Sequence, residues 1–131
     1  MEGILDKPTG KRFLAKILTE EERAELERRH RSADPAGRIR AAEFAAGRFA
    51  VKEAVSKAFG CGIGALLGFH DIRVTADGKG RPSCGISAEA LKRLGLERQA
   101  VSVHVSITHT GTLAGAFAVV ERLQEDGGMR P

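Results

Sequence analysis

The chain has 131 residues, a net charge of +4 and a hydrophobic fraction of 42%. This length is typical of one domain and is sufficient for a hydrophobic core without disulfides or metals. No apolar run approaches the roughly 20 residues that cross a membrane, and the N-terminus lacks the apolar segment of a signal peptide. We therefore expect a cytoplasmic protein. Cys61 and Cys84 are too few for a disulfide framework and too far apart for a metal knuckle, so we expect buried or bystander thiols.

The first half of the chain predicts helices at about 9–18, 19–32 and 38–59. Thr19 followed by Glu22 has the spacing of a capping box, which opens a helix. Residues 34–37, Asp-Pro-Ala-Gly, predict a turn before the longest helix. The glycines at 60, 62 and 64 lack the Lys-Ser/Thr pair of a phosphate-binding loop and do not follow a strand. They predict the end of that helix instead.

The second half changes to the two-residue period of strands. We expect strands at 70–75 and 83–86 joined by a turn, a helix at 87–94, and a strand at 101–108. The apolar run 113–120 predicts a strand covered on both faces. Strands that follow helices predict an α+β fold with an antiparallel sheet packed against the long helix. We expect one domain over residues 1–123 and a disordered polar tail over 124–131.

Basic side chains gather between Lys7 and Arg40, where they suit an anionic partner such as nucleic acid, phosphate or an acidic protein. Glutamates are interleaved between Glu20 and Glu27, and charge alone therefore favours a solvated helix surface. Proteins that bind single-stranded nucleic acid usually add stacking aromatics. This stretch offers only Phe13, so we expect no nucleic-acid partner.

One face of the helix expected at 38–59 combines small residues with one acid and one base. At about 100° per residue this face collects Ala46, Ala50, Glu53 and Lys57. The expected core stripe on the other side consists of Phe44, Val51, Val55, Ala58 and Phe59. Spacing alone permits a helix-stabilising ion pair between Glu53 and Lys57. The small residues beside them indicate a surface that another group approaches closely.

Several segments resemble the holo-(acyl-carrier-protein) synthase family, in the same order and spacing. Residues 44–64, Phe-Ala-Ala-Gly-Arg-Phe-Ala-Val-Lys-Glu-Ala-Val-Ser-Lys-Ala-Phe-Gly-Cys-Gly-Ile-Gly, are similar to the family signature R-F-A-x-K-E-A-x-x-K-A-x-G-x-G-I. Residues 77–82 resemble its turn ending in G-K-P, and 105–110 its V-S-I-S/T-H-T strand end. Residues 11–18 resemble its R-F-x-x-R-I-L stretch. The resemblance covers about residues 10–121.

The resemblance implies the 4'-phosphopantetheinyl transferase fold and a homotrimer with active sites between subunits. It also implies a reaction of fatty acid biosynthesis, in which the 4'-phosphopantetheine arm of coenzyme A moves to a serine of apo acyl carrier protein. Adenosine 3',5'-bisphosphate is released. The coenzyme A diphosphate is strongly anionic, and Mg²⁺ neutralises such charge when carboxylates hold it. By resemblance Glu53 binds this ion, and Lys57 contacts the diphosphate as a second catalytic residue.

The resemblance also implies two binding surfaces. The coenzyme A contacts it suggests are Arg48, Lys57, Gly80, Pro82, His109 and Thr110. The surface it suggests for docking the small, acidic carrier protein consists of Arg12, Phe13, Lys16 and Phe49, where charge would steer the encounter. Turn chemistry alone also accounts for His109. His104 alternates with valines and is expected to be an exposed strand residue.

The chain departs from the family at its start. The family opens with a strand of the form G-I-G-x-D-I-x-x-I-x-R-I, whose aspartate is the other metal-binding carboxylate. Asp6 does not match it, because it lies too near residues 11–18 and precedes Lys-Pro-Thr-Gly. Either the true start lies upstream, or the chain is a truncated form. A truncated form would bind Mg²⁺ weakly and transfer little, or act as a non-catalytic module that binds acyl carrier protein or coenzyme A without turnover.

Overall fold

A computed structural model describes residues 8–29, 34–110 and 113–123. Its helices and strands are α1 (Pro8–Ile17), α2 (Glu20–Arg29), α3 (Pro35–Ala58), β1 (Ile72–Ala76), β2 (Pro82–Ile86), α4 (Ala88–Arg93), β3 (Val101–Thr110) and β4 (Leu113–Arg122). Two short 3-10 turns, η2 (Phe69–Asp71) and η3 (Arg98–Ala100), precede β1 and β3. Within these ranges no helix is long and apolar enough to cross a membrane. The tail expected at 124–131 lies outside the described residues.

The helices begin where polar side chains satisfy their free backbone N–H groups. The capping box of α2 is confirmed: Thr19 N donates to Glu22 Oε1 at 2.9 Å, and Glu22 N donates to Thr19 Oγ1 at 3.2 Å. The turn expected at 34–37 is instead the first turn of α3. Asp34 Oδ1 caps this helix by accepting from Gly37 N at 2.6 Å, and Pro35 occupies the first helical position, which it suits.

The glycines after α3 end the helix, as predicted. Gly60 has a φ of 87° and Gly62 a φ of 69°, a left-handed conformation that glycine adopts without steric cost. Their N–H groups return to the last turn, Gly60 N to Lys57 O at 2.9 Å and Gly62 N to Ser56 O at 3.0 Å. The chain leaves the helix sharply at this point.

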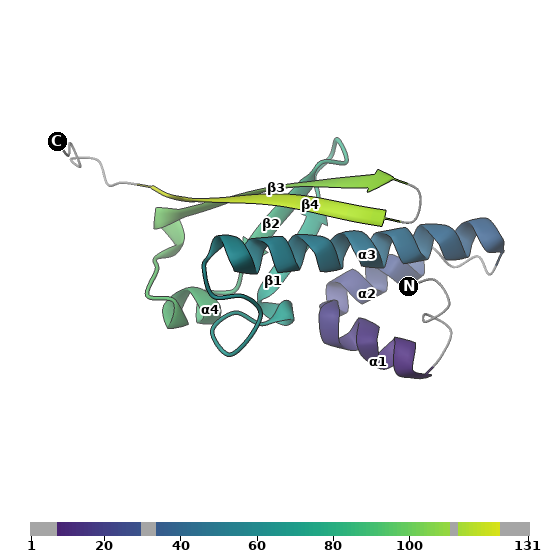
Figure 1. Ribbon diagram of the computed structural model, residues 1–131, viewed down its shortest axis with the longest axis horizontal. Coiled ribbons are helices and arrows are strands. Elements are labelled where there is room, and N and C mark those ends of the chain that lie inside the picture. Colours follow the sequence, from purple (N-terminus) through teal and green to yellow (C-terminus); the bar gives the residue numbers. More distant parts are fainter. Residues whose placement is uncertain (1–7, 30–33, 111–112, 124–131) are drawn as a thin grey trace.

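The strands pair in two antiparallel hairpins, each a separate two-stranded sheet. In the first, Val74 lies opposite Cys84; in the second, Val105 lies opposite Ala118. The antiparallel pairing was predicted, but the single sheet was not correct. Figure 1 shows α3 running along the β3–β4 hairpin, with β1–β2 crossing behind and α1 and α2 beside the N-terminal half of α3.

The expectation that the last strand is covered on both faces is wrong. Ala116 and Ala118 pack partly buried against the core. Phe117 and Val119, which point to the other side, are 74% and 57% exposed. Only one face of the β3–β4 hairpin rests on α3, so side chains alternate between covered and open positions along β4.

In the described part of the chain, two clusters of buried residues form the core, and α3 contributes to both. One consists of Val51, Val55, Leu67, Ile72, Val74 and Ala90. The other consists of Ile17, Leu18, Leu26 and Phe44. Most of the stripe predicted for the long helix is therefore confirmed. Ala58 is the exception: it is exposed because it is the last residue of α3, where the chain turns away from the core.

Candidate functional site

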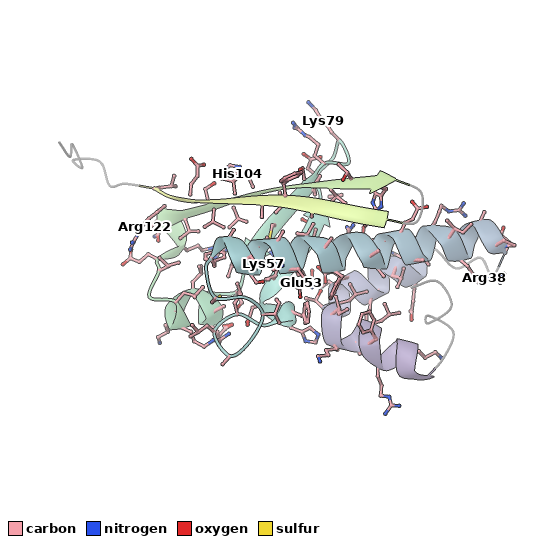
Figure 2. The ribbon with its side chains drawn as sticks, in the orientation of Figure 1. Arg38, Glu53, Lys57, Lys79, His104 and Arg122 are labelled. Carbon is pink, nitrogen blue, oxygen red and sulfur yellow. The ribbon has the colours of Figure 1, made fainter. Side chains whose placement is uncertain are left out.

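Glu53 and Lys57 lie one turn apart on the C-terminal half of α3, as their spacing predicted (Figure 2). Glu53 is half-buried and Lys57 is exposed. The ion pair that the spacing permitted is not formed. Neither side chain has a hydrogen bond or ion pair with any residue in the described part of the chain. The carboxylate and the ammonium are thus both available to a ligand.

The neighbouring residue, Lys52, was missed by the sequence analysis. Its side chain has 0% exposure. The ammonium donates to Ile17 O at 2.7 Å, to Glu22 Oε1 at 2.6 Å and to Phe69 O at 3.1 Å. Burial lowers the pKa of Lys52 below its usual value, and the charge of Glu22 opposes this effect. The position of Lys52 on the helical wheel, close to Phe59 and on the core side, was the signal that could have identified it.

The predicted coenzyme A contacts His109 and Arg48 lie near the middle of α3. A Cβ at Gly47 would lie 3.4 Å from His109 Cε1 and 3.6 Å from His109 Nε2, so the imidazole rests on this turn of the helix. Arg48 is buried, and the central carbon of its guanidinium lies over the Phe44 ring, 4.0 Å from the ring centre. Gly47 precedes Glu53 by roughly 9 Å along the helix axis at 1.5 Å per residue.

Thr110 is the last residue of β3, where it pairs with Leu113. Its side chain lies outside the described atoms, so its predicted contact stays a prediction. His104, expected to be an exposed strand residue, is exposed, and its Nε2 lies 2.8 Å from Glu121 Oε1 on β4.

Gly80 lies in the β1–β2 turn, and Pro82 is the first residue of β2. Gly80 has a φ of 81°, and Asp77 organises the turn by accepting from Lys79 N at 2.8 Å and Arg81 N at 2.9 Å. Figure 2 shows Lys79 at the tip of this turn, beyond the β3–β4 hairpin, while Glu53 lies on the other side of that hairpin. Within one chain, therefore, the structure does not bring the Lys79 end of the β1–β2 turn to Glu53.

The residues predicted to dock the carrier do come together. The Phe13 ring of α1 lies 6.1 Å from the Phe49 ring of α3, centre to centre. Phe49 in turn lies 5.8 Å from the Phe69 ring. Arg12 and Lys16 are exposed on α1, one turn apart. Together these residues give a basic surface with a partly apolar base.

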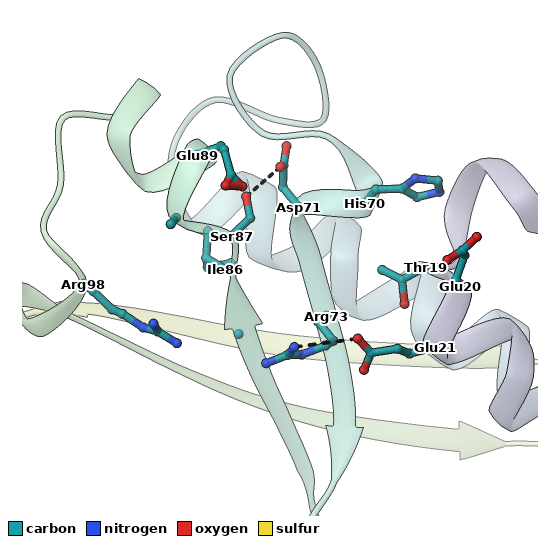
Figure 3. Close-up of a pocket in the computed structure, with 12 residues that line it drawn as sticks. Thr19, Glu20, Glu21, His70, Asp71, Arg73, Ile86, Ser87, Glu89 and Arg98 are labelled. Atoms are coloured by element: carbon teal, nitrogen blue, oxygen red, sulfur yellow. Dashed lines mark hydrogen bonds and ion pairs between the residues drawn. The ribbon is translucent and has the colours of Figure 1, made fainter.

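A pocket of about 510 Å³ lies elsewhere, between the start of α2, η2, the β1–β2 hairpin and the start of α4 (Figure 3). None of the predicted site residues lines it. Asp71 in its wall accepts from Ser87 Oγ at 2.7 Å and from Arg93 Nη2 at 2.7 Å. Burial opposes ionisation, yet hydrogen bonds from Ser87, Gly68 N and Arg93 hold the pKa of Asp71 below its usual value. These bonds join η2 to α4, a structural role.

The donor set around Glu53 is small. Among the described residues, no group of three or more His, Cys, Asp or Glu side chains is arranged to hold a metal ion. Glu53 offers one carboxylate with free oxygens. Mg²⁺ is usually bound through one or two carboxylates together with substrate phosphates and waters. A single glutamate therefore fits a site that a phosphate ligand completes.

Comparison with known proteins agrees with the resemblance noted in the sequence. Residues 3–115 match the model of the 4'-phosphopantetheinyl transferase superfamily. The holo-(acyl-carrier-protein) synthase of Bacillus subtilis (strain 168) is 44% identical over 115 residues, which span 86% of this chain and 80% of that protein. The enzyme of the same name from Halalkalibacterium halodurans is 40% identical over 115 residues, covering 86% and 79%.

Solved structures with the same fold carry the same name. The Helicobacter pylori holo-(acyl-carrier-protein) synthase in complex with coenzyme A superposes with a TM-score of 0.70 at 30% identity. That match covers 92% of this chain and 90% of the other. The Neisseria meningitidis enzyme gives a TM-score of 0.70 at 31% identity, covering 92% and 89%. The α+β fold predicted from the sequence is confirmed, and the chain belongs to the 4'-phosphopantetheinyl transferase superfamily as a relative of the holo-(acyl-carrier-protein) synthases.

Proposed function

We propose that the protein transfers the 4'-phosphopantetheine arm of coenzyme A to a serine hydroxyl of apo acyl carrier protein. Adenosine 3',5'-bisphosphate is the other product, and the reaction takes place in the cytoplasm. The observation that carries the proposal is the face of α3 where Glu53 and Lys57 lie one turn apart, without partners among the described residues. Family membership and the coenzyme A complex of the Helicobacter pylori relative support this reading of that face.

Glu53 and Lys57 have complementary roles in this proposal. Glu53 would hold Mg²⁺, which supplies charge neutralisation at the diphosphate when it is bound. Lys57 donates to a diphosphate oxygen and offsets the negative charge that grows as the bond to the leaving phosphate breaks. Both side chains lie on one rigid helix, so their spacing is fixed before the substrate arrives.

Coenzyme A is bound between subunits of a homotrimer. Two observations support this part of the proposal. Lys79, the neighbour of Gly80 in the β1–β2 turn, and Glu53 lie on opposite sides of the β3–β4 hairpin in Figure 2, so a second copy would have to supply Gly80 and Pro82 if both groups contact one ligand. The outer face of that hairpin exposes Phe117 and Val119, which a neighbouring copy would cover.

The carrier docks on α1. Arg12 and Lys16 present positive charge to the acidic carrier. Phe13 of α1 and Phe49 of α3, whose rings lie next to each other, provide an apolar contact for the carrier. Charge of this kind mainly raises the rate of encounter, whereas the apolar contact holds the complex.

The test is a mass measurement on the carrier. Apo acyl carrier protein is incubated with coenzyme A, Mg²⁺ and the protein, and we expect it to gain the mass of one phosphopantetheine arm. A carrier whose serine is replaced by alanine is the control and should gain nothing. Unchanged mass of the intact carrier would refute the proposal.

A second candidate function follows from the single carboxylate at the site. In the described part of the chain no group of three or more His, Cys, Asp or Glu side chains surrounds Glu53, and a site with Glu53 as its single carboxylate would bind Mg²⁺ more weakly than a site with two. The protein would then bind acyl carrier protein or coenzyme A without turnover. Titration calorimetry with each partner separates the two functions: binding that persists while the carrier mass stays constant identifies the non-catalytic module.

A further inference from the structure

The buried ammonium of Lys52 uses all of its hydrogen-bond donors to bond groups on other elements. A lysine ammonium has three N–H donors, and Lys52 directs them to Ile17 O, Glu22 Oε1 and Phe69 O. Lysine is almost never fully buried unless it is paired. No donor is left for a substrate, so Lys52 acts through the segments that it joins.

Glu22 completes the arrangement from the other side. Its carboxylate is 2% exposed. Oε1 accepts from Thr19 N as well as from Lys52, and Oε2 accepts from Val74 N at 2.7 Å. One ammonium and one carboxylate therefore tie together the end of α1, the start of α2, η2, β1 and α3.

These segments are the ones that carry the two halves of the proposed reaction. Ile17 is the last residue of α1, so the ammonium lies at the negative end of the docking helix. Phe69, whose carbonyl oxygen also accepts from Lys52, places its ring against Phe49 of the docking surface. The next residue after Lys52 is Glu53.

We propose that Lys52, together with Glu22, is a positioning residue that fixes the carrier-docking helix α1 against the turn of α3 that carries Glu53. The inference rests on the proposed transfer. The serine of a docked carrier reaches the diphosphate only if α1 has a fixed position relative to Glu53. Small displacements of reacting groups slow such reactions strongly. Buried ion pairs add little net stability compared with apolar residues of similar volume, so the pair is better explained by placement.

The test compares variants that separate stability from placement. Lys52→Met keeps the aliphatic stem but leaves the Glu22 carboxylate buried without its cation, so this variant should be destabilised. The double variant Lys52→Met/Glu22→Gln lacks both charges of this buried pair, and its denaturant midpoint should recover. Its kcat/KM for the carrier should remain roughly tenfold or more below that of the unmodified protein. The KM for coenzyme A should change by less than about twofold. Lys92→Met, an exposed lysine on α4, is the matched control.

Hydrogen exchange supplies a readout that needs no turnover. In Lys52→Met, amides of α1 should exchange roughly tenfold faster than in Lys92→Met, while β3–β4 amides keep their protection. Equal exchange of α1 in the two variants would overturn the inference, as would a double variant that recovers both stability and carrier kcat/KM. Failure of the proposed function is distinct, because the unmodified protein itself would then leave the carrier mass unchanged; that result overturns the role of Lys52 in transfer as well.

Discussion

At the scale of single residues, burial decides which ionisable groups are open to ligands. The side chains of Glu53 and Lys57 have no hydrogen-bond or ion-pair partner among the described residues. In contrast, every side-chain polar atom of Lys52 and Glu22 is bonded, either to the other residue of the pair or to a backbone group. Lys52 and Glu53 are therefore neighbours on one helix with different roles. The pair without partners, Glu53 and Lys57, can bind a charged substrate, whereas the bonded pair, Lys52 and Glu22, holds the surrounding elements together.

The thiol of Cys84 predicts a loss of stability at alkaline pH. Burial raises its pKa from 9.0 to about 12. Above pH 9.0 the unfolded chain loses this proton while the folded chain keeps it, so the free energy of unfolding falls as the pH rises toward 12. Cys84→Ala should have a shallower fall, although the cavity it leaves lowers its stability at neutral pH.

Urea unfolding at neutral pH and at several pH values above 9.0 measures this effect. Val74→Ala, which leaves a cavity opposite Cys84 without removing a thiol, is the control and should keep the slope of the unmodified protein. Parallel curves for Cys84→Ala and the unmodified protein would show that Cys84 does not titrate in this way.

The sequence predicted the positions of Glu53 and Lys57, which have no partners, better than the buried contacts of Lys52 and Glu22. Glu53 and Lys57 follow from helical periodicity and from a motif, both of which are local. The capping role of Glu22 was also local, because Thr19 is three residues away. Its bonds to Lys52 and Val74 join residues 30 and 52 positions apart, and no local pattern contains them.

At the scale of elements, α3 depends on its first turn. The Asp34 carboxylate accepts from Gly37 N at 2.6 Å, so Asp34→Ala leaves that N–H without this partner. We expect the free energy of unfolding to fall by about 1 kcal/mol, measured by urea denaturation, while Asp34→Asn should retain most of it. An unchanged midpoint in Asp34→Ala would mean that the cap contributes nothing.

The helix α1 is predicted to carry the carrier-binding charge. Arg12→Glu reverses one exposed charge of the docking surface. The KM for apo acyl carrier protein should rise, and its dependence on salt should weaken, because fewer charges steer the encounter. The KM for coenzyme A should not change. Lys92→Glu on α4 gives the same change in net charge and should leave the carrier KM as it was; equal effects of the two variants would remove α1 from carrier binding.

Most helices and strands were predictable because their signals lie within one turn or one period. The start of α3 was misplaced because Asp-Pro-Ala-Gly suits a turn and a capped first helical turn equally well. The coverage of β4 was misjudged for a different reason. An apolar run shows that both of its faces can be covered, and Phe117 shows that one of them is not covered by this chain.

At the scale of the whole molecule, the open face of β3–β4 predicts assembly. Phe117→Asp places a charge in the centre of that face, where a neighbouring copy would have to bury it. The unmodified protein should sediment as a trimer and Phe117→Asp as smaller species. Leu66→Asp, at an exposed apolar residue outside β3–β4, should remain trimeric. A monomeric unmodified protein, or a trimeric Phe117→Asp variant, would contradict the assembly through this face.

The central claim is that Glu53, on the open face of α3, is the carboxylate on which transfer depends. Its most direct test is the initial rate at which apo acyl carrier protein gains mass with coenzyme A and Mg²⁺, for the unmodified protein, Glu53→Gln and Glu43→Gln. Glu43 is another half-buried glutamate on the same helix. Loss of several kcal/mol of charge stabilisation predicts a rate at least about a hundredfold lower for Glu53→Gln, with Glu43→Gln near the unmodified rate. Equal rates for Glu53→Gln and the unmodified protein would contradict the account.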